Sequence, residues 1–221
     1  MNPLPIQLNP KGEYMRSDPN DFRAIKVRKI FNQIKDSKIL DVCCADGALL
    51  RPFTRQNQIY GIDYSPNIAE AEGYKEVKNA NLEHESLPYA ADFFDVVFAG
   101  ECIEHIANTQ HVLKEINRVL KKGGLFVLTT PNCRTIQTLI LLALFNLPSP
   151  AAAHYKSAHV RDWTTKLLHR VLEEHHFEVQ SMIGTDLTGW LPKIGAFKTC
   201  SGLATHIPSL SSQVIVTCKK S

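Results

Sequence analysis

The segment between residues 39 and 63 restricts the fold of this chain more than any other. Two apolar runs of strand length, 39 to 42 and 59 to 62, flank a short turn. Asp63 ends the second run, twenty residues after Cys43 in the turn. In a βαβ unit of a parallel sheet, a carboxylate at this separation lies where a ribose hydroxyl pair binds. The segment therefore predicts a parallel α/β sheet with a nucleoside site at its carboxyl edge.

The turn after the first run disfavours a phosphate ligand. Dinucleotide-binding turns carry glycines at G-x-G-x-x-G spacing, so that a pyrophosphate can approach backbone N–H groups. Here Cys43 and Ala45 occupy the first two glycine positions, only Gly47 remains, and Asp46 adds a negative charge. A cationic nucleoside that carries a sulfonium and an amino group suits Asp41 and Asp46 better.

The turn and several later segments resemble class I S-adenosylmethionine-dependent methyltransferases. Leu40-Asp41-Val42-Cys43-Cys44-Ala45-Asp46-Gly47 is similar to their first motif, L-D-V-G-C-G-x-G, with Cys and Ala replacing two glycines. The other similar segments follow in the family's order: Leu87-Pro88-Tyr89 with Phe94 to Phe98, Glu101-Cys102-Ile103-Glu104-His105-Ile106, Leu113 to Gly124, and Thr129-Thr130-Pro131-Asn132. Five ordered segments are much more specific than one glycine turn.

Apolar periodicity gives the order of the elements independently of this resemblance. Strand-length apolar runs cover residues 38–43, 58–62, 75–79, 94–99, 124–130, 178–183 and 213–218, and helical patterns cover 21–38, 67–73, 108–122 and 164–176. This alternation implies a parallel sheet covered by helices on both faces. Together with the resemblance, it predicts a doubly wound, mostly parallel seven-stranded α/β sheet with a small cap formed by insertions.

The length of 221 residues favours one domain. Its expected parts are an N-terminal arm and helix (1–37), a cofactor-binding core (38–130), an apolar cap insertion (131–163), and a C-terminal helix, loop and strands (164–221). Residues 136 to 147 are too few to span a bilayer, which needs about 20 residues. We expect a buried cap helix there, with a wall of an acceptor pocket or weak membrane docking as alternatives. Residues 186 to 209 indicate a loop with at least one helical turn.

The resemblance implies S-adenosylmethionine as the cofactor and S-adenosylhomocysteine as its product. Asp63 is the strongest assignment, for the ribose, and Asp41 would face the methionine amino group or instead satisfy the turn. Tyr64 would stack on the adenine or cover the sheet. Asn81 stands where the family commonly has Asp, and Glu101 would lie near the methionine end or cap a turn. The expected cofactor-binding set is Asp41, Cys43, Ala45, Gly47, Asp63, Tyr64, Asn81, Leu82 and Glu101.

Two histidines are candidates for catalysis. Methyl transfer depends mainly on positioning, and a base is needed only if the accepting OH or NH loses a proton. His105 is the first candidate because it follows the fourth expected strand, although a structural role competes with this one. His159 is the second, in His159 to Thr164, which resembles the family segment H-x-R-x-F-T with Thr164 as helix N-cap. A loop anchored by His159 and Arg161 is the alternative there, and His154 and Tyr155 could line the same pocket.

Composition limits the remaining possibilities. A formal net charge of +3 without a dense basic run gives no reason to expect a nucleic-acid partner. The first thirty residues lack an apolar signal core, so we expect a cytoplasmic protein without a transmembrane segment. Six cysteines show no metal-ligand spacing, which predicts reduced thiols and no metal site. Cys43 and Cys44, which flank the proposed ligand, would be the thiols that react with modifying reagents.

These patterns favour an enzyme that methylates an O, an N or a C atom of a small, apolar or aromatic acceptor. The alternative is a catalytically inactive protein that binds S-adenosylmethionine or S-adenosylhomocysteine and has a regulatory or partner-binding role. A nicotinamide oxidoreductase is disfavoured by the degenerate glycine turn. The sequence does not determine the oligomeric state or identify the acceptor.

Overall fold

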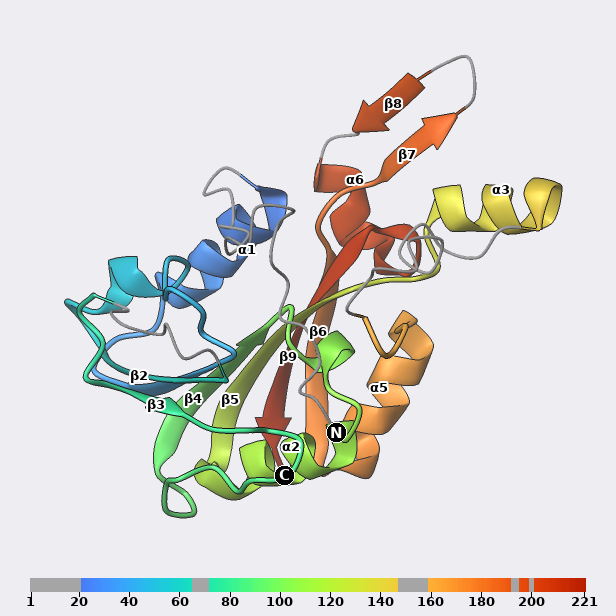
Figure 1. Ribbon diagram of the computed structural model, residues 1–221. Helices are drawn as coiled ribbons and strands as arrows, with labels where there is room; N and C mark the ends of the chain where they lie inside the picture. Colours follow the sequence, from blue (N-terminus) through green and yellow to red (C-terminus); the bar gives the residue numbers. More distant parts are fainter. Residues whose placement is uncertain (1–20, 65–71, 147–158, 192–194, 199–200) are drawn as a thin grey trace.

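A computed structural model describes residues 21–64, 72–146, 159–191, 195–198 and 201–221. Its centre is a seven-stranded sheet with the order β3-β2-β1-β4-β5-β9-β6 (Figure 1). The strands are β1 (Lys38–Val42), β2 (Gln58–Asp63), β3 (Glu76–Asn79), β4 (Phe94–Gly100), β5 (Leu120–Pro131), β6 (Phe177–Gly184) and β9 (Gln213–Lys220). The first five pair in parallel, and β9 is antiparallel to both β5 and β6. The expected doubly wound, mostly parallel sheet is confirmed.

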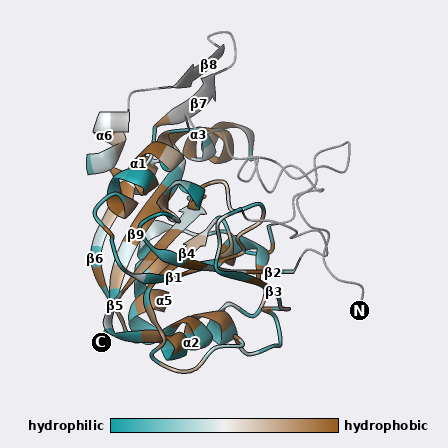
Figure 2. Ribbon diagram, turned by 90° about the vertical axis from the view of Figure 1, so that its left-hand side faces the viewer, coloured by the Kyte–Doolittle hydropathy of each residue, from teal (hydrophilic) through white to brown (hydrophobic). Residues whose placement is uncertain are grey.

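Helices cover both faces of this sheet (Figure 2). On one face, α2 (Thr109–Val119) and α5 (Thr165–Glu174) pack their leucines and isoleucines against inward residues of β1, β4 and β5. On the other face, α1 (Phe22–Phe31) and the 3-10 turn η1 (Arg51–Phe53) form a second core in which Phe31 meets Phe53 and Phe98. A strand that is buried on both faces needs apolar residues on both, which explains the continuous apolar runs.

Side-chain caps define where the main helices begin. Asp21, Asn108 and Thr164 each accept a hydrogen bond from a backbone N–H in the first turn of α1, α2 and α5. The prediction of Thr164 as an N-cap is thereby confirmed. The expected end, near residue 122, of the helix predicted over residues 108–122 is wrong, because the chain already pairs as β5 from Leu120, opposite Phe94. Burial of the Leu120 side chain in the core outweighs the local helical pattern.

The expectation of a buried cap helix after β5 is also wrong. Helix α3 (Ile136–Phe145) projects from the body of the protein at the right of Figure 1, and none of its described side chains is buried. Leu139, Leu142 and Leu144 are 41%, 54% and 72% exposed. An apolar composition predicts burial only when a partner surface is present, and no described element covers this helix on every side.

Residues 186 to 209 contain more regular structure than the expected loop. They include an antiparallel hairpin of β7 (Thr188–Leu191) and β8 (Gly195–Lys198), then α6 (Ser201–His206) and the 3-10 turn η3 (Pro208–Leu210). The expectation of at least one helical turn is therefore confirmed, and the hairpin was not predicted. The expected arm at 1–20 and most of the helix expected at 67–73 lie outside the described residues.

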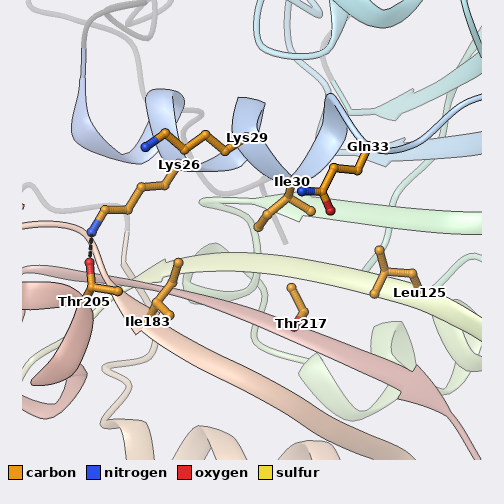
Figure 3. Close-up of a pocket in the computed structure, with 8 residues that line it drawn as sticks. All are labelled: Lys26, Lys29, Ile30, Gln33, Leu125, Ile183, Thr205 and Thr217. Carbon is orange, nitrogen blue, oxygen red and sulfur yellow. Dashed lines mark hydrogen bonds between the residues drawn. The ribbon is translucent and has the colours of Figure 1, made fainter. Parts of the chain in front are cut away.

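A hollow of about 480 Å³ lies between α1 and the sheet, away from the strand ends (Figure 3). Lys26 borders it and donates hydrogen bonds to the Gly184 carbonyl (2.6 Å) and the Thr205 hydroxyl (2.7 Å). Its floor consists of sheet residues Leu125, Ile183 and Thr217.

Within the described part of the chain, no helix is both long enough and apolar enough to cross a bilayer.

Candidate cofactor and acceptor site

The candidate site lies where the strand order changes direction. β1 has β2 on one side and β4 on the other, so the chain leaves the sheet centre in opposite directions at its carboxyl edge. Open α/β sheets bind ligands in the crevice outside this point. Asp63 at the end of β2, the turn after β1 and Glu101 after β4 all lie at this edge.

The turn after β1 has an unusual backbone for its sequence. Cys43, Ala45 and Gly47 have φ angles of 58°, 48° and 67°, all in the left-handed region. A residue with a Cβ pays about 1–2 kcal/mol for this conformation, whereas glycine does not. Cys43 and Ala45 are the two positions where the family motif has glycine, so the chain keeps the glycine conformation without the glycines.

Asp63 holds this turn in place. The Ala45 N–H donates a hydrogen bond of 2.8 Å to Asp63 Oδ2, and the Cys44 N–H donates to the Ile62 carbonyl at 3.0 Å. The Asp63 residue is 9% exposed. The acid that the sequence predicts for a ribose therefore orients the turn after β1.

Asp41 is buried beneath the turn and bonded to a residue that sequence reasoning missed. The Tyr74 hydroxyl donates a 2.6 Å hydrogen bond to Asp41 Oδ2. The pKa of Asp41 is raised from 3.8 to about 7, chiefly by burial; the Tyr74 hydrogen bond opposes this rise, and the charges of Asp63 and Asp46 contribute to it. Burial, followed by the charge of Asp41, also raises the pKa of Tyr74. A tyrosine just before an expected edge strand gave no signal of this contact.

Three residues of the expected cofactor-binding set, Tyr64, Asn81 and Leu82, lie in different settings. Tyr64 is 41% exposed directly after Asp63, as a stacking ring would be. Asn81 Oδ1 accepts a bond from the Glu83 N–H (3.0 Å), so this amide already closes a local turn. The Leu82 side chain lies in the core, which limits its contribution to its backbone.

Glu101 follows β4 with a left-handed φ of 51°. Its carboxylate accepts hydrogen bonds from the Thr129 hydroxyl (3.0 Å) and the Gln213 amide (3.1 Å), which belong to β5 and β9. Burial raises the pKa of Glu101, although the nearby Arg23 guanidinium opposes this rise. The hydrogen bonds tie the expected methionine-end residue to the central strands.

The two histidines expected at the acceptor come together with a third residue, Glu104. Their rings lie 4.8 Å apart between centroids, and His105 Nε2 lies 3.8 Å from Glu104 Oε1. Glu104 is only 1% exposed, and its Oε2 accepts a bond from the Thr130 hydroxyl at 3.0 Å. We name Glu104, His105 and His159 the acceptor cluster.

Burial and neighbouring charge shape the acceptor cluster. Burial, followed by the charge of Glu101, raises the pKa of Glu104 well above its usual range. Burial lowers the pKa of His159, and Asp162 opposes this change. Sequence reasoning quoted Glu104 within a family segment but gave it no role; its position directly before His105 was the available signal. His154 and Tyr155 lie outside the described residues.

The loop that carries His159 is fixed to the loop that carries His105. The N–H groups of Val160 and Arg161 both donate to the Glu104 carbonyl, at 2.9 and 3.2 Å. The Arg161 guanidinium donates to the Ala107 carbonyl at 3.2 Å. The anchored loop expected as the alternative role of this segment is thus present, and the same bonds bring His159 to His105.

The expectation of reduced thiols is wrong for two of the cysteines. Cys43 in the turn after β1 and Cys102 after β4 form a disulfide, with their Cα atoms 5.8 Å apart. Cys44, Cys133 and Cys218 are free. Sequence spacing gave no indication of the bond because 59 residues separate the pair, and only the parallel pairing of β1 with β4 brings them together. The bond joins the turn after β1 to the loop that leads into the acceptor cluster.

A comparison with protein families decides the classification. The model of the family described as Methyltransferase domain matches residues 14–196. This chain belongs to the Methyltransferase domain family. The match includes every strand of the sheet except β9, as well as the acceptor cluster. The family and the fold imply S-adenosylmethionine as methyl donor.

Individual relatives of this methyltransferase-domain protein agree with the classification. The chain is 31% identical over 151 residues to a demethylmenaquinone methyltransferase of Staphylococcus aureus (strain JH9), an alignment that includes 62% of this chain and 63% of the relative. It therefore spans less than two thirds of the relative's length.

Solved structures with the same fold are more distant in sequence. A SAM-dependent methyltransferase from Archaeoglobus fulgidus has a TM-score of 0.63 at 17% identity, over 90% of this chain and 93% of that one. An S-adenosylmethionine-dependent methyltransferase from Mesorhizobium loti has a TM-score of 0.62 at 12% identity, over 90% and 98%. At these identities the likeness shows the fold alone.

Proposed function

We propose that this protein is an S-adenosylmethionine-dependent methyltransferase that modifies an oxygen or nitrogen atom of a small acceptor. The observation that carries the proposal is the placement of the acceptor cluster. The Cys43–Cys102 bond joins the cofactor turn to the loop that continues into Glu104 and His105. The ionisable groups of the acceptor cluster would therefore lie beside the bound methyl donor. Ionisable groups gathered at such a position are typical of a catalytic site.

The residues at the carboxyl edge fit such a cofactor. Asp63 offers a carboxylate for the ribose hydroxyls, and Asp41 offers one for the methionine amino group. Tyr64, Asn81 and the backbone of Leu82 would surround the adenine, and Glu101 would face the methionine end. The left-handed turn at Cys43, Ala45 and Gly47 would lie beside the bound cofactor, and Asp46 disfavours phosphates. These carboxylates favour a cationic ligand over an anionic one.

When bound, S-adenosylmethionine supplies a methyl group on a sulfonium: a new bond forms from the acceptor atom to carbon as the C–S bond breaks and its electron pair stays on sulfur. The protein must hold the acceptor in line and accept or release the proton of its OH or NH. His105, partly exposed at 25%, is the group in the acceptor cluster that can reach an incoming molecule. His159 would position the acceptor from the opposite loop.

We also infer that the acceptor is apolar or aromatic in part. Helix α3 begins five residues after the end of β5, at the carboxyl edge of the sheet, and three of its leucines are exposed. By its name, the Staphylococcus aureus relative acts on demethylmenaquinone, which is consistent with such an acceptor.

Calorimetric titration with S-adenosylhomocysteine tests the cofactor assignment. Asp63→Ala should weaken binding by about 1.5–3 kcal/mol, the cost of losing hydrogen bonds to a charged group. Glu173→Ala, on the exposed surface of α5, is the matched control and should bind as the wild type does. No heat of binding in the wild-type protein would overturn the proposal.

Transfer of labelled methyl groups to fractionated cell extract tests the enzymatic assignment. A labelled product that requires the wild-type protein supports it. Binding of S-adenosylhomocysteine without any transfer would instead favour the inactive binding protein.

A further inference from the structure

The acceptor cluster combines the residue types that hold transition-metal cations. Among the described residues, Glu104, His105 and His159 each offer one ligand atom, and these atoms lie within 4.8 Å of one another. Imidazole nitrogens and a carboxylate oxygen are ligands for divalent cations such as Mn²⁺, Fe²⁺, Co²⁺ and Zn²⁺. The expectation of no metal site considered cysteine spacing and did not include this arrangement.

One buried atom in the cluster lacks a hydrogen bond. Glu104 Oε1 is inaccessible to solvent and has no hydrogen-bond partner, although its other oxygen is bonded to Thr130. A buried carboxylate oxygen without a donor destabilises the folded protein, so such an atom needs an explanation. The nearest ring nitrogen, His105 Nε2, lies 3.8 Å from this oxygen, and a cation between the two atoms would provide the missing partner.

The supporting bonds resemble those that orient metal ligands. The Thr130 hydroxyl fixes the Glu104 carboxylate, and the Val160 and Arg161 N–H groups fix the loop of His159 to the Glu104 backbone. Such contacts set the direction of the ligand atoms. Two atoms bound to one cation at about 2.1 Å lie roughly 3–4 Å apart, somewhat closer than the 4.8 Å within which the three ligand atoms of this cluster lie. The His105 side chain is 25% exposed.

We propose that Glu104, His105 and His159 bind a divalent first-row transition-metal cation, which in turn binds a hydroxyl group of the methyl acceptor. The inference rests on the proposed function, because it explains how the same cluster handles the acceptor. A cation lowers the pKa of a bound hydroxyl, so the O–H proton passes to water and the oxygen becomes the nucleophile. Both imidazoles are then ligands, and neither receives the proton.

Binding of Mn²⁺ to the full chain tests this without an acceptor. After treatment with a chelator and its removal, Mn²⁺ is titrated while the signal of the free ion is followed by electron paramagnetic resonance. Mn²⁺ is chosen because it prefers oxygen and nitrogen ligands to the free thiols. We expect one bound ion per chain, and at least a tenfold weaker affinity in Glu104→Gln and in His159→Gln.

The exposed pair His169 and Glu173 on α5 supplies matched controls, His169→Gln and Glu173→Gln, which should bind Mn²⁺ as the wild type does. Circular dichroism and S-adenosylhomocysteine titration of every variant show whether the fold and the cofactor site are intact. Absence of a bound ion, or equal affinity in wild type and both cluster variants, overturns the metal site. If S-adenosylhomocysteine still binds in that case, the proposed function stands and His105 acts on the acceptor directly.

Discussion

Asp41 should make both stability and cofactor affinity depend on pH, and Asp41→Asn should remove that dependence. The carboxyl group is 4% exposed, and its hydrogen bond from Tyr74 does not offset the cost of burying its charge. The pKa of Asp41 in the folded protein is about 7, against an ordinary value of 3.8. Asparagine has the same shape, can accept the Tyr74 bond and carries no charge.

The sign of the effect follows from proton binding. Because its pKa is raised, folded Asp41 keeps its proton where the unfolded chain has already lost it. The free energy of unfolding therefore falls as pH rises from about 4 to about 7, and the loss is complete above that range. Each pKa unit is worth about 1.36 kcal/mol, so the full loss is about 4 kcal/mol, of which roughly 2.5 kcal/mol develops between pH 5 and pH 8.

Thermal unfolding of wild type and Asp41→Asn at pH 5 and pH 8 measures this loss. For a chain of this size 1 kcal/mol corresponds to roughly 2–4 °C, so the stability advantage of the variant should grow by about 5–10 °C at the higher pH. Comparing the two proteins at each pH cancels the titration of all other groups. An advantage that does not change with pH would refute the raised pKa.

The same comparison tests the proposed contact with the methionine amino group. That contact needs the charged carboxylate, so wild-type affinity for S-adenosylhomocysteine should fall up to tenfold per pH unit below pH 7. The variant should bind more weakly at pH 8 and show no such fall. A wild-type affinity that is constant from pH 5 to pH 8 would place the amino group elsewhere.

Three further predictions concern single positions. Ala45→Gly should raise the melting temperature by about 1–4 °C, because relief of the left-handed strain exceeds the entropy that glycine adds to the unfolded chain. The control Ala90→Gly should lower the melting temperature, because the φ angle of Ala90 is not left-handed. Equal shifts in melting temperature for the two variants would disprove the strain at Ala45. Leu144→Asp should change unfolding free energy by less than about 0.5 kcal/mol in a denaturant titration, since the side chain is 72% exposed; a large loss would mean that the helix is covered. Asn81→Asp should leave the affinity for S-adenosylhomocysteine, measured by calorimetry, unchanged or increase it. A large loss of affinity would mean that the adenine does not contact this residue.

Much of the fold could be predicted because its signals are local. Alternating apolar runs and helix caps such as Thr164 act within a few residues, and they gave the sheet and most of its helices. The end of α2 could not be predicted, because pairing of Leu120 with Phe94 overrides a continuous helical pattern. Helix α3 was misread for the opposite reason: its apolar residues predict burial, but whether a partner surface exists is a property of the whole fold.

In the candidate site, too, local features could be predicted from the sequence and contacts between distant segments could not. Asp63 and the glycine positions could be identified because a βαβ unit fixes their separation along the chain. The Cys43–Cys102 bond and the contact of Tyr74 with Asp41 join residues from different parts of the chain, and only the strand order brings them together. Glu104 was missed because its role depends on His159, which comes from a distant loop.

The position of β9 has a consequence for how this protein is made. β9 lies between β5 and β6, and it follows all the other strands of the sheet in chain order. While the chain emerges from a ribosome, β5 and β6 each expose an unpaired edge until β9 arrives between them. Unpaired edges of this kind pair readily with other chains. Cells that synthesise this protein would therefore have to shield a nascent chain whose sheet stays open until β9 has been made. A deletion that removes β9 should direct the product to chaperones or proteases.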